Sequence, residues 1–328
     1  MPPELPVTIG DVHAAARRII GVAVHTPLVP ATGLGERAGA PVSLKLEGIQ
    51  PTGSFKVRGA ASKVTRLDRA AAARGVVTAS TGNHGRAVAH VGRSLGIPAT
   101  VCVSEHVPPG KVRALRDLGC DLVVGGRSQT EGLAAAAELV AERGMTLVHP
   151  FDDPDVIAGQ GTIGLEVAEQ APDAGTILVP LSGGGLISGV AVAAATRLPD
   201  ARVVGVSMER APVMAASLHR GQPVELDEQP TLADSLQGGV GSDNRCTFAI
   251  TRALVHEVVL VTEQQIWDAM RWLYDHHRLV VEGGGAVGVA ALLAGRVAVE
   301  GHAVVVVSGA NAEDGQVAAM AQGAAEPP

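Results

Sequence analysis

The sequence predicts an α/β protein in which largely parallel sheets are covered by helices on both faces. Runs of β-branched residues alternate with Ala-rich helical stretches along most of the chain, which is the pattern of repeated βαβ units. Aromatic residues make up only 2% of the 328 residues and apolar residues 46%, so the core should consist mainly of Ala, Val, Leu and Ile. The chain is long enough for one large domain or two domains in close contact.

Eight short apolar runs have the length and β-branched content of buried strands. The alternating run VSLKLEG at 42–48 predicts a further strand. The eight runs lie at 75–80, 99–104, 121–125, 146–150, 176–181, 201–207, 258–262 and 303–308.

Helical stretches lie between these runs, and Asp11 is a candidate N-cap for the first of them. Each crossover from one parallel strand to the next should be right-handed. The expected helical segments are 11–20, 84–96, 130–144, 159–171, 186–198, 263–277 and 286–298.

Composition and charge argue against several classes of protein. The net charge is −7, and the absence of a basic patch argues against nucleic-acid binding. No run of 18 apolar residues is present, so we expect no membrane span. The first residues lack the basic and apolar regions of a secretory signal. The three cysteines are isolated in the sequence, as in a cytoplasmic protein with reduced thiols, and we expect a cytoplasmic location.

Four small, polar, glycine-rich segments follow predicted strands. They are PTGSFK at 51–56, STGNHG at 80–85, LSGGGL at 181–186 and SGAN at 308–311. Because ligands of open α/β sheets bind at the carboxyl ends of the strands, these segments are the candidate site. The first contains Lys56 among Gly, Ser and Thr residues, a setting that suits a lysine that forms a covalent bond.

Each segment alone has an ordinary alternative. The glycines at 183–185 could form a tight turn, or they could present N–H groups at a helix start to a phosphate. Ser80 or Thr81 could simply cap the helix that follows. Together the segments offer an amine, an anion cradle, an amide and a hydroxyl. A cofactor with an aldehyde, a phosphate and a heteroaromatic nitrogen would use each, and pyridoxal 5'-phosphate (PLP) is such a cofactor.

The segments KLEGIQPTGSFKVRGA, STGNHG, LSGGGL and SGAN, in this order, resemble the threonine/serine dehydratase family of fold-type II PLP enzymes, which includes serine racemase. The resemblance covers residues 10–320. It implies a two-domain, tryptophan synthase β-like α/β fold in which each domain is a mostly parallel sheet flanked by helices. Residues 1–64 and 150–328 are expected to form the large PLP-binding domain, and 65–149 a small inserted domain, with no C-terminal regulatory domain.

The resemblance also implies the residues that hold the cofactor. Lys56 matches the lysine that forms the Schiff base with the cofactor aldehyde. Asn83 matches the amide that bonds the ring hydroxyl, Glu282 a glutamate close to the ring, and Ser308 the residue that faces the pyridine nitrogen. The phosphate loop corresponds to Ser182, Gly183, Gly184, Gly185 and Leu186.

The loop after the strand at 75–80 resembles the family's binding site for the substrate carboxylate. It implies that Ser80, Thr81, Asn83 and His84 bind substrate, His84 more through its backbone than through its ring. Thr81 stands where serine racemases have a serine that acts on the opposite face of the cofactor, so we treat Thr81 as a second catalytic candidate beside Lys56.

The family's chemistry implies a β-elimination. The amine of Lys56 removes a proton from Cα of a β-hydroxy amino acid such as threonine or serine, and the products are a 2-oxo acid and ammonia. Ser308 is neutral and cannot hold the pyridine nitrogen protonated as an aspartate would, which favours elimination over transamination. A racemase-like activity is the alternative that Thr81 leaves open.

Two departures from the family pattern bear on ligands. Ser207 and Val213 stand where relatives often place acidic ligands for a divalent cation, so we expect no metal there. The segment TLADSLQGGVGSDNR at 231–245 begins like the family's substrate-side region and then diverges. Its pattern resembles hydroxyectoine utilisation dehydratases, so a hydroxyectoine-derived amino acid is an alternative substrate.

Two other classes compete with this interpretation. The run GGGAVG at 283–288 matches the G-x-G-x-x-G fingerprint of nicotinamide-dependent dehydrogenases, with Glu300 near the expected spacing, although the glycines could equally serve close helix packing. The second competitor is a binding protein that kept the fold without its chemistry, against which Lys56 argues. We expect a small-molecule amino-acid substrate and, by resemblance, a homodimer.

Overall fold

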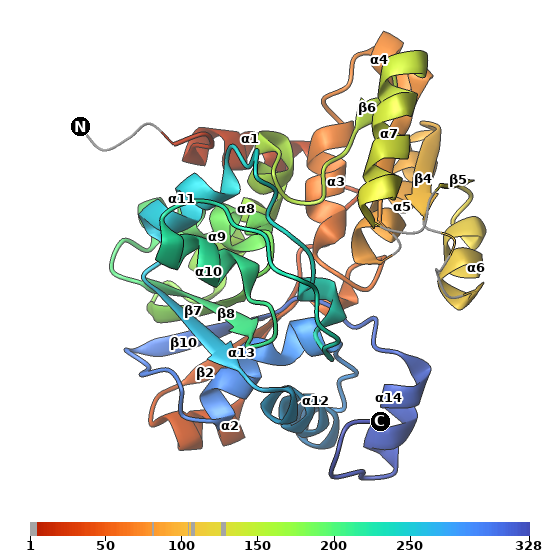
Figure 1. The fold of residues 1–328 in the computed structure, drawn as a ribbon. Helices are drawn as coiled ribbons and strands as arrows, with labels where there is room; N and C mark the ends of the chain where they lie inside the picture. Colours follow the sequence, from red (N-terminus) through yellow and green to blue (C-terminus); the bar gives the residue numbers. More distant parts are fainter. Residues whose placement is uncertain (1–4, 81, 104, 106–108, 126–128) are drawn as a thin grey trace.

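The computed structural model of the chain describes residues 5–80, 82–103, 105, 109–125 and 129–328, and in them it contains two sheets (Figure 1). The larger sheet has six strands in the order β1-β2-β10-β7-β8-β9, and the smaller has four in the order β5-β4-β3-β6. The strands of the larger sheet are β1 Leu28–Pro30, β2 Val42–Leu46, β7 Ala174–Pro180, β8 Arg202–Met208, β9 Glu257–Val261 and β10 His302–Val307. Those of the smaller sheet are β3 Val76–Ala79, β4 Ala99–Val103, β5 Asp121–Val124 and β6 Thr146–Leu147.

Helices connect almost all of these strands. Those that precede β7 are α1 Ile9–Arg18, α2 Thr32–Ala38, α3 Lys56–Val64, α4 Arg69–Arg74, α5 Asn83–Leu95, α6 Pro109–Asp117, α7 Gln129–Arg143 and α8 Pro154–Gln170. Those that follow it are α9 Gly185–Arg197, α10 Val213–Arg220, α11 Thr247–Leu254, α12 Glu263–His277, α13 Gly283–Leu293 and α14 Asp314–Ala321. Two single 3-10 turns, η1 Glu47–Ile49 and η2 Asp234–Leu236, complete the set.

Strand pairing confirms the predicted parallel sheets. Every neighbouring pair is parallel except β1 with β2. In the larger sheet, Val305 of β10 lies between Leu44 of β2 and Leu178 of β7. The sequence pattern missed β1, because a three-residue strand that ends in proline gives no periodic signal.

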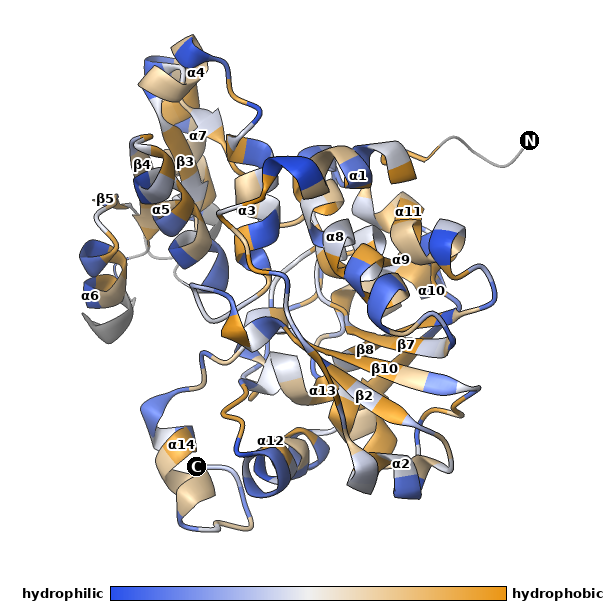
Figure 2. Cartoon of the chain, turned by 180° about the vertical axis from the view of Figure 1, so that it is seen from behind, coloured by the Kyte–Doolittle hydropathy of each residue, from blue (hydrophilic) through white to orange (hydrophobic). Residues whose placement is uncertain are grey.

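The core lies on both faces of the larger sheet. Helices α12, α13 and α2 pack on one face and α8 and α9 on the other. Figure 2 shows the central strands as the most hydrophobic part of the chain, whereas several surface helices are partly hydrophilic. In the smaller sheet α5 and α7 pack on opposite faces, and this sheet and its helices form a separate lobe in Figure 1. The lobe spans β3 to β6, but the domain boundaries at 64/65 and 149/150 stay a prediction.

Two local predictions need correction. Asp11 is not the N-cap of α1, because Thr8 is. The Thr8 hydroxyl accepts a bond from the Asp11 N–H, and the Asp11 carboxylate accepts one from the Thr8 N–H, which is a capping box. Helix α5 has Gly82 as its N-cap and no side-chain cap, so Ser80 does not cap it, and Thr81 lies outside the described residues. Strand β2 alternates in sequence, yet all five of its residues are buried.

None of the helices in the described ranges has the length and apolarity that a bilayer-spanning helix needs. Residues 279–282 form no strand before α13, so the nicotinamide fingerprint at 283–288 lacks the strand that its function requires. Its glycines instead allow close packing. A Cβ atom on Gly283 would lie 2.2 Å from the carbonyl oxygen of Leu232, and one on Gly284 would lie 2.2 Å from the Ser235 hydroxyl.

Candidate active site

A pocket of about 390 Å³ lies where strands of both sheets end. Its lining includes residues at or just after the carboxyl ends of β3, β4, β7 and β10, which is where open α/β sheets bind ligands. The volume is in the range of small-molecule sites. All of the predicted site residues that the structure describes line this pocket, namely Lys56, Ser80, Asn83, His84, Ser182, Gly183, Gly184, Gly185, Leu186, Glu282 and Ser308. Thr81 lies outside the described residues.

Lys56 is the first residue of α3, ten residues beyond the end of β2. The loop before it is fixed to the segment that follows β10. The N–H of Phe55 donates a hydrogen bond of 3.0 Å to Ser308 O, and the N–H of Ala310 donates one of 2.8 Å to Gly53 O. Gly53 has φ +73°, a left-handed conformation that favours glycine. The lysine is therefore placed by two far-apart segments of the chain.

The Lys56 amine is held in the pocket in a weakly basic state. It is half-buried, and its Nζ donates a hydrogen bond of 2.8 Å to Pro150 O. Burial lowers the pKa of Lys56 to about 8, and the nearby carboxylate of Glu282 partly opposes this shift. About a tenth of the amine is then unprotonated at pH 7, and this form is a nucleophile and a base.

The glycine loop lies at the start of α9, where its backbone could hold an anion. Gly184 has φ +87° and is the N-cap, and α9 begins at Gly185. The ring of Phe151 packs on this loop so closely that a Cβ atom on Gly183 would lie 2.5 Å from it. No charged side chain occurs in 182–186, so the backbone N–H groups and the helix dipole must supply the attraction for an anion.

Asn83, Glu282 and Asn311 form a hydrogen-bonded set on another wall. Asn83 Nδ2 donates to Glu282 Oε1 at 2.7 Å, and Asn311 Nδ2 donates to Asn83 Oδ1 at 2.6 Å. The N–H of Asn311 donates to Glu282 Oε2 at 3.2 Å. Burial, followed by the charge of Asp234, raises the pKa of Glu282 to about 7, although hydrogen bonds from Ser235, Asn83 and Asn311 oppose the rise. Glu282 can thus carry a proton near neutral pH.

His84 is buried in the neutral form. Burial, and then the nearby charge of Lys56, lowers its pKa to about 3. Its Nε2 lies 2.8 Å from Val148 O, so this nitrogen is the donor and Nδ1 is the acceptor. Within the described part of the chain, Nδ1 is buried without a hydrogen-bond partner. The ring is therefore uncharged at neutral pH, and the role of the His84 backbone in binding substrate stays a prediction.

The structure adds pocket residues that the sequence motifs did not single out. Phe55, Phe151 and Arg86 line the pocket, as do Glu228 and the η2 residues Asp234 and Ser235. Arg86 Nη1 donates a hydrogen bond of 2.8 Å to Asn311 Oδ1. Arg86 had one sequence signal, because a cation in the first turn of a helix is unfavourable for the helix dipole. Phe151 had no sequence signal, because it contacts Gly183 from 32 positions away in the chain.

The pocket residues fit PLP. The glycine loop at the start of α9 would hold the phosphate, Lys56 would bind the aldehyde, and Asn83 would reach the ring hydroxyl. Ser308, which is 3% exposed at the end of β10, would face the ring nitrogen with a neutral hydroxyl.

Comparison with known proteins assigns the family. Residues 21–309 match the family model described as pyridoxal-phosphate dependent enzyme. The chain belongs to this family. It is 45% identical to the L-threonine ammonia-lyase of Geobacter sulfurreducens, over 94% of this chain and 76% of that protein. It is 42% identical to the L-threonine ammonia-lyase of Thermotoga maritima, over 93% of this chain and 76% of that protein.

A solved structure of maize serine racemase superposes with a TM-score of 0.91 at 33% identity, covering 97% of this chain and 98% of that one. Membership of the family confirms the predicted PLP cofactor and the two-sheet fold-type II architecture. It also separates this enzyme from the nicotinamide-dependent class, whose fingerprint lacked a strand.

Proposed function

We propose that the enzyme dehydrates and deaminates a β-hydroxy amino acid, with L-threonine as the first candidate substrate, to a 2-oxo acid and ammonia. The observation that carries the proposal is the placement of the Lys56 amine in one pocket with the glycine loop and the neutral Ser308 hydroxyl. Similarity over more than nine-tenths of the chain to proteins named L-threonine ammonia-lyase supports it.

When bound, PLP supplies the electron sink that makes the Cα proton of an amino acid acidic. The residues of the chain supply the base and the binding groups. The Lys56 amine, with its pKa lowered to about 8, accepts that proton on Nζ. The glycine loop at the start of α9 would hold the phosphate. Phe151 supports this loop, with its ring against Gly183 and its backbone against Gly185.

The start of α5 orients the substrate. The N–H groups of its first turn have no intrahelical partner and point their dipole at an anion, so we assign the substrate carboxylate to this turn, with the Ser80 hydroxyl beside it. Asn83 in this turn donates to Glu282, and Glu282 in turn accepts from the N–H of Asn311 in the loop that follows β10. The pocket wall at Asp234 and Ser235 then faces the side chain of the substrate and would decide its size and polarity.

Three narrower statements are also proposals. A hydroxyectoine-derived amino acid remains a prediction that rests on the pattern at 231–245 and finds no support in the names of these relatives. A racemase-like side activity depends on Thr81, which lies outside the described residues. A homodimer in the cytoplasm, with no nucleic-acid partner, is our expectation for the assembly and location. The described residues contain no group of three or more His, Cys, Asp or Glu side chains placed to hold a metal.

A substrate panel tests the proposal. The purified, PLP-loaded protein is incubated with L-threonine, L-serine, D-serine and hydroxyectoine-derived amino acids, and both ammonia and 2-oxo acid are measured. We expect equal amounts of the two products from L-threonine, and none from Lys56→Ala. A yellow protein that releases no ammonia from any β-hydroxy amino acid would contradict the proposal, and conversion of L-serine to D-serine without ammonia would favour a racemase.

A further inference from the structure

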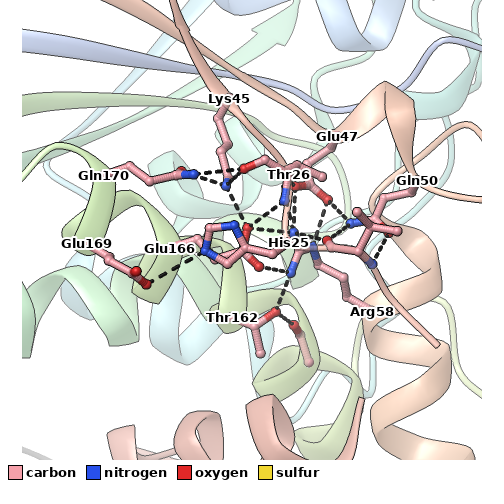
Figure 3. Close-up of polar contacts among 12 residues, drawn as sticks. His25, Thr26, Lys45, Glu47, Gln50, Arg58, Thr162, Glu166, Glu169 and Gln170 are labelled. Carbon is pink, nitrogen blue, oxygen red and sulfur yellow. Dashed lines mark hydrogen bonds and ion pairs between the residues drawn. The ribbon is translucent and has the colours of Figure 1, made fainter. Parts of the chain in front are cut away.

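Figure 3 shows a buried cluster of charged side chains, none of which lines the pocket. Its members, which we call the ion cluster, are Lys45 on β2, Glu47 on η1, Arg58 on α3 and Glu166 on α8. The side chains of Lys45, Glu47 and Arg58 are at most 1% exposed, and that of Glu166 is 11% exposed. Two acids and two bases therefore balance each other in the interior.

Arg58 is the centre of the cluster. Its Nε and Nη2 donate to the two carboxylate oxygens of Glu47 at 2.8 and 2.9 Å. Its Nη1 and Nη2 donate to the two oxygens of Glu166 at 2.5 and 2.9 Å. Nη1 also donates to Thr162 at 3.0 Å, and Nη2 to Val24 O at 3.1 Å. The guanidinium thus joins α3 to η1, to α8 and to the segment before β1.

Arg58 and Glu166 keep their charges. Burial opposes the charge of Arg58, but Glu47 and Glu166 outweigh it and raise the pKa of the guanidinium above its usual range. Burial likewise opposes the charge of Glu166, but Arg58 and Lys45 hold the pKa of that carboxyl below its usual value. Apolar side chains of similar volume could fill this space at no lower stability. What a bidentate ion pair adds over apolar packing is a fixed geometry.

The geometry that the cluster fixes is that of the first turn of α3. Arg58 is the third residue of this helix, and Lys56 is the first. On the other side of Lys56, the Phe55 N–H is bonded to Ser308 O. The lysine therefore stands between two anchors, one at the end of β10 and one at the ion cluster.

We propose that Arg58 is the positioning residue for Lys56, holding the first turn of α3 so that Nζ faces the cofactor site. Arg58 does not touch the pocket, so it acts only through Lys56. The inference deepens the proposed function, because it rests on Lys56 as the residue that binds PLP. It predicts that loosening Arg58 changes the environment of the Lys56 amine as well as the stability of the fold.

The test is Arg58→Lys, which keeps the charge but loses the two-oxygen fork. In the cofactor-free full chain, labelling of Lys56 by an amine reagent is followed by mass spectrometry across a pH series. We expect the apparent pKa of Lys56 to rise from about 8 towards its ordinary 10.5, because a displaced amine is more exposed to solvent. The charged or polar groups that face the amine, Glu282, His84 and His149, are unchanged in this variant. In the PLP-loaded enzyme we expect an altered visible spectrum and a kcat lower by on the order of a hundredfold, with KM changed far less.

Lys45→Met is the matched control. Lys45 is as buried as Arg58 and also bonds Glu166, at 2.6 Å. It lies on β2, and its other hydrogen bonds run to Thr26 O and Gln170 rather than to α3. Its replacement should lower the urea midpoint at least as much as Arg58→Lys while leaving the pKa of Lys56 near 8. Glu47→Gln provides a second variant that weakens the Arg58 contact without changing α3, and it decides the role of Arg58 if Arg58→Lys does not fold.

The proposal is overturned if Arg58→Lys and Glu47→Gln lower stability alone, with the Lys56 pKa, the spectrum and kcat unchanged. It is equally overturned if Lys45→Met shifts the pKa of Lys56 as much as they do. If the wild-type protein binds PLP but releases no ammonia from any substrate, the proposed function fails, whereas the Lys56 titration and the spectrum still decide the role of Arg58.

Discussion

The backbone N–H of Phe55 donates a 3.0 Å hydrogen bond to the carbonyl oxygen of Ser308. The residue beside the candidate cofactor lysine is thereby fixed to the residue that would face the cofactor ring nitrogen. Strands β2 and β10 are parallel neighbours in the larger sheet, so their carboxyl ends bring these two segments together although 253 positions separate Phe55 from Ser308 in the sequence. The site is thus a direct product of the strand order.

Gly184→Ala should weaken cofactor binding more than it weakens the fold. Gly184 has φ +87°, and an added Cβ would lie 2.9 Å from Met214 Cε and 3.0 Å from Thr247 Cβ, so the N–H groups of the loop must shift. We expect PLP affinity to fall by about 1–3 kcal/mol, the value of one lost phosphate hydrogen bond, as measured by fluorescence titration. Gly221→Ala is the control, since φ is +79° there and nothing lies within 4 Å of the added Cβ. Equal losses of affinity in the two variants would refute the anion site.

Cofactor uptake should depend on pH through Lys56. The pKa of Lys56 is lowered from 10.5 to about 8, and only the unprotonated amine attacks an aldehyde. The rate of colour development after mixing PLP with the cofactor-free chain should therefore rise about tenfold from pH 6 to pH 7 and level off above about pH 8. A simple alkylamine measured in parallel continues to gain rate up to its own pKa. A protein rate that follows the alkylamine to pH 10 would show that the amine is not buried in the pocket.

Glu282→Gln should change how stability depends on pH. The folded-state pKa of Glu282 is raised from 4.5 to about 7, so the folded state binds more protons than the unfolded state between these values, and the wild type loses stability as pH rises through them. The free energy of unfolding of the wild type falls by on the order of 3 kcal/mol over this range. The glutamine variant does not lose this stability, because glutamine has no charge to bury. Urea unfolding of the cofactor-free chain from pH 4.5 to 8 should show the variant gaining on the wild type over this window.

A flat difference between Glu282→Gln and the wild type would contradict the raised pKa. Glu300→Gln serves as the control, because the Glu300 side chain is 68% exposed and its loss should alter stability little at any pH.

Ser308→Asp should alter the outcome of the reaction, whereas Ser308→Ala should mainly alter cofactor binding. A carboxylate at this buried position would keep the cofactor ring nitrogen protonated and draw more charge into the ring. We expect the aspartate variant to release ammonia at least about tenfold more slowly and to lose its colour during turnover, as the cofactor is aminated. The alanine variant should bind PLP about tenfold more weakly, the equivalent of one hydrogen bond. An aspartate variant with full lyase rate would refute the role of the neutral hydroxyl.

The sequence predicted the strands well because long β-branched runs have few alternatives. It also predicted which loops meet, since the carboxyl ends of parallel strands share one edge. The sequence did not predict short or irregular elements correctly. Strand β1 has three residues, β6 has only two of the five expected, and α8 begins at Pro154 rather than at 159 because Asp153 caps it.

What the sequence could not supply was the pairing between far-apart side chains. Lys45 lies in an alternating run on β2, yet it is buried and paired with Glu166 on α8. Arg58 lies in the segment KLEGIQPTGSFKVRGA that carried the family resemblance. Its four hydrogen bonds to carboxylate oxygens go to Glu47 on η1 and Glu166 on α8, which the segment alone did not predict. Tertiary packing decides which residue pairs with a buried charge, so no local sequence pattern predicts that partner.

The most direct test of the cofactor site is borohydride reduction of the yellow protein followed by peptide mass mapping. The chain has four lysines, Lys45, Lys56, Lys63 and Lys111, and the Lys56→Ala variant is the control. We predict that the mass of the reduced cofactor is found on Lys56 alone, and that Lys56→Ala carries none and loses more than about a thousandfold in ammonia release. Attachment to another lysine, or full activity of Lys56→Ala, would contradict the assignment of Lys56 as the cofactor lysine.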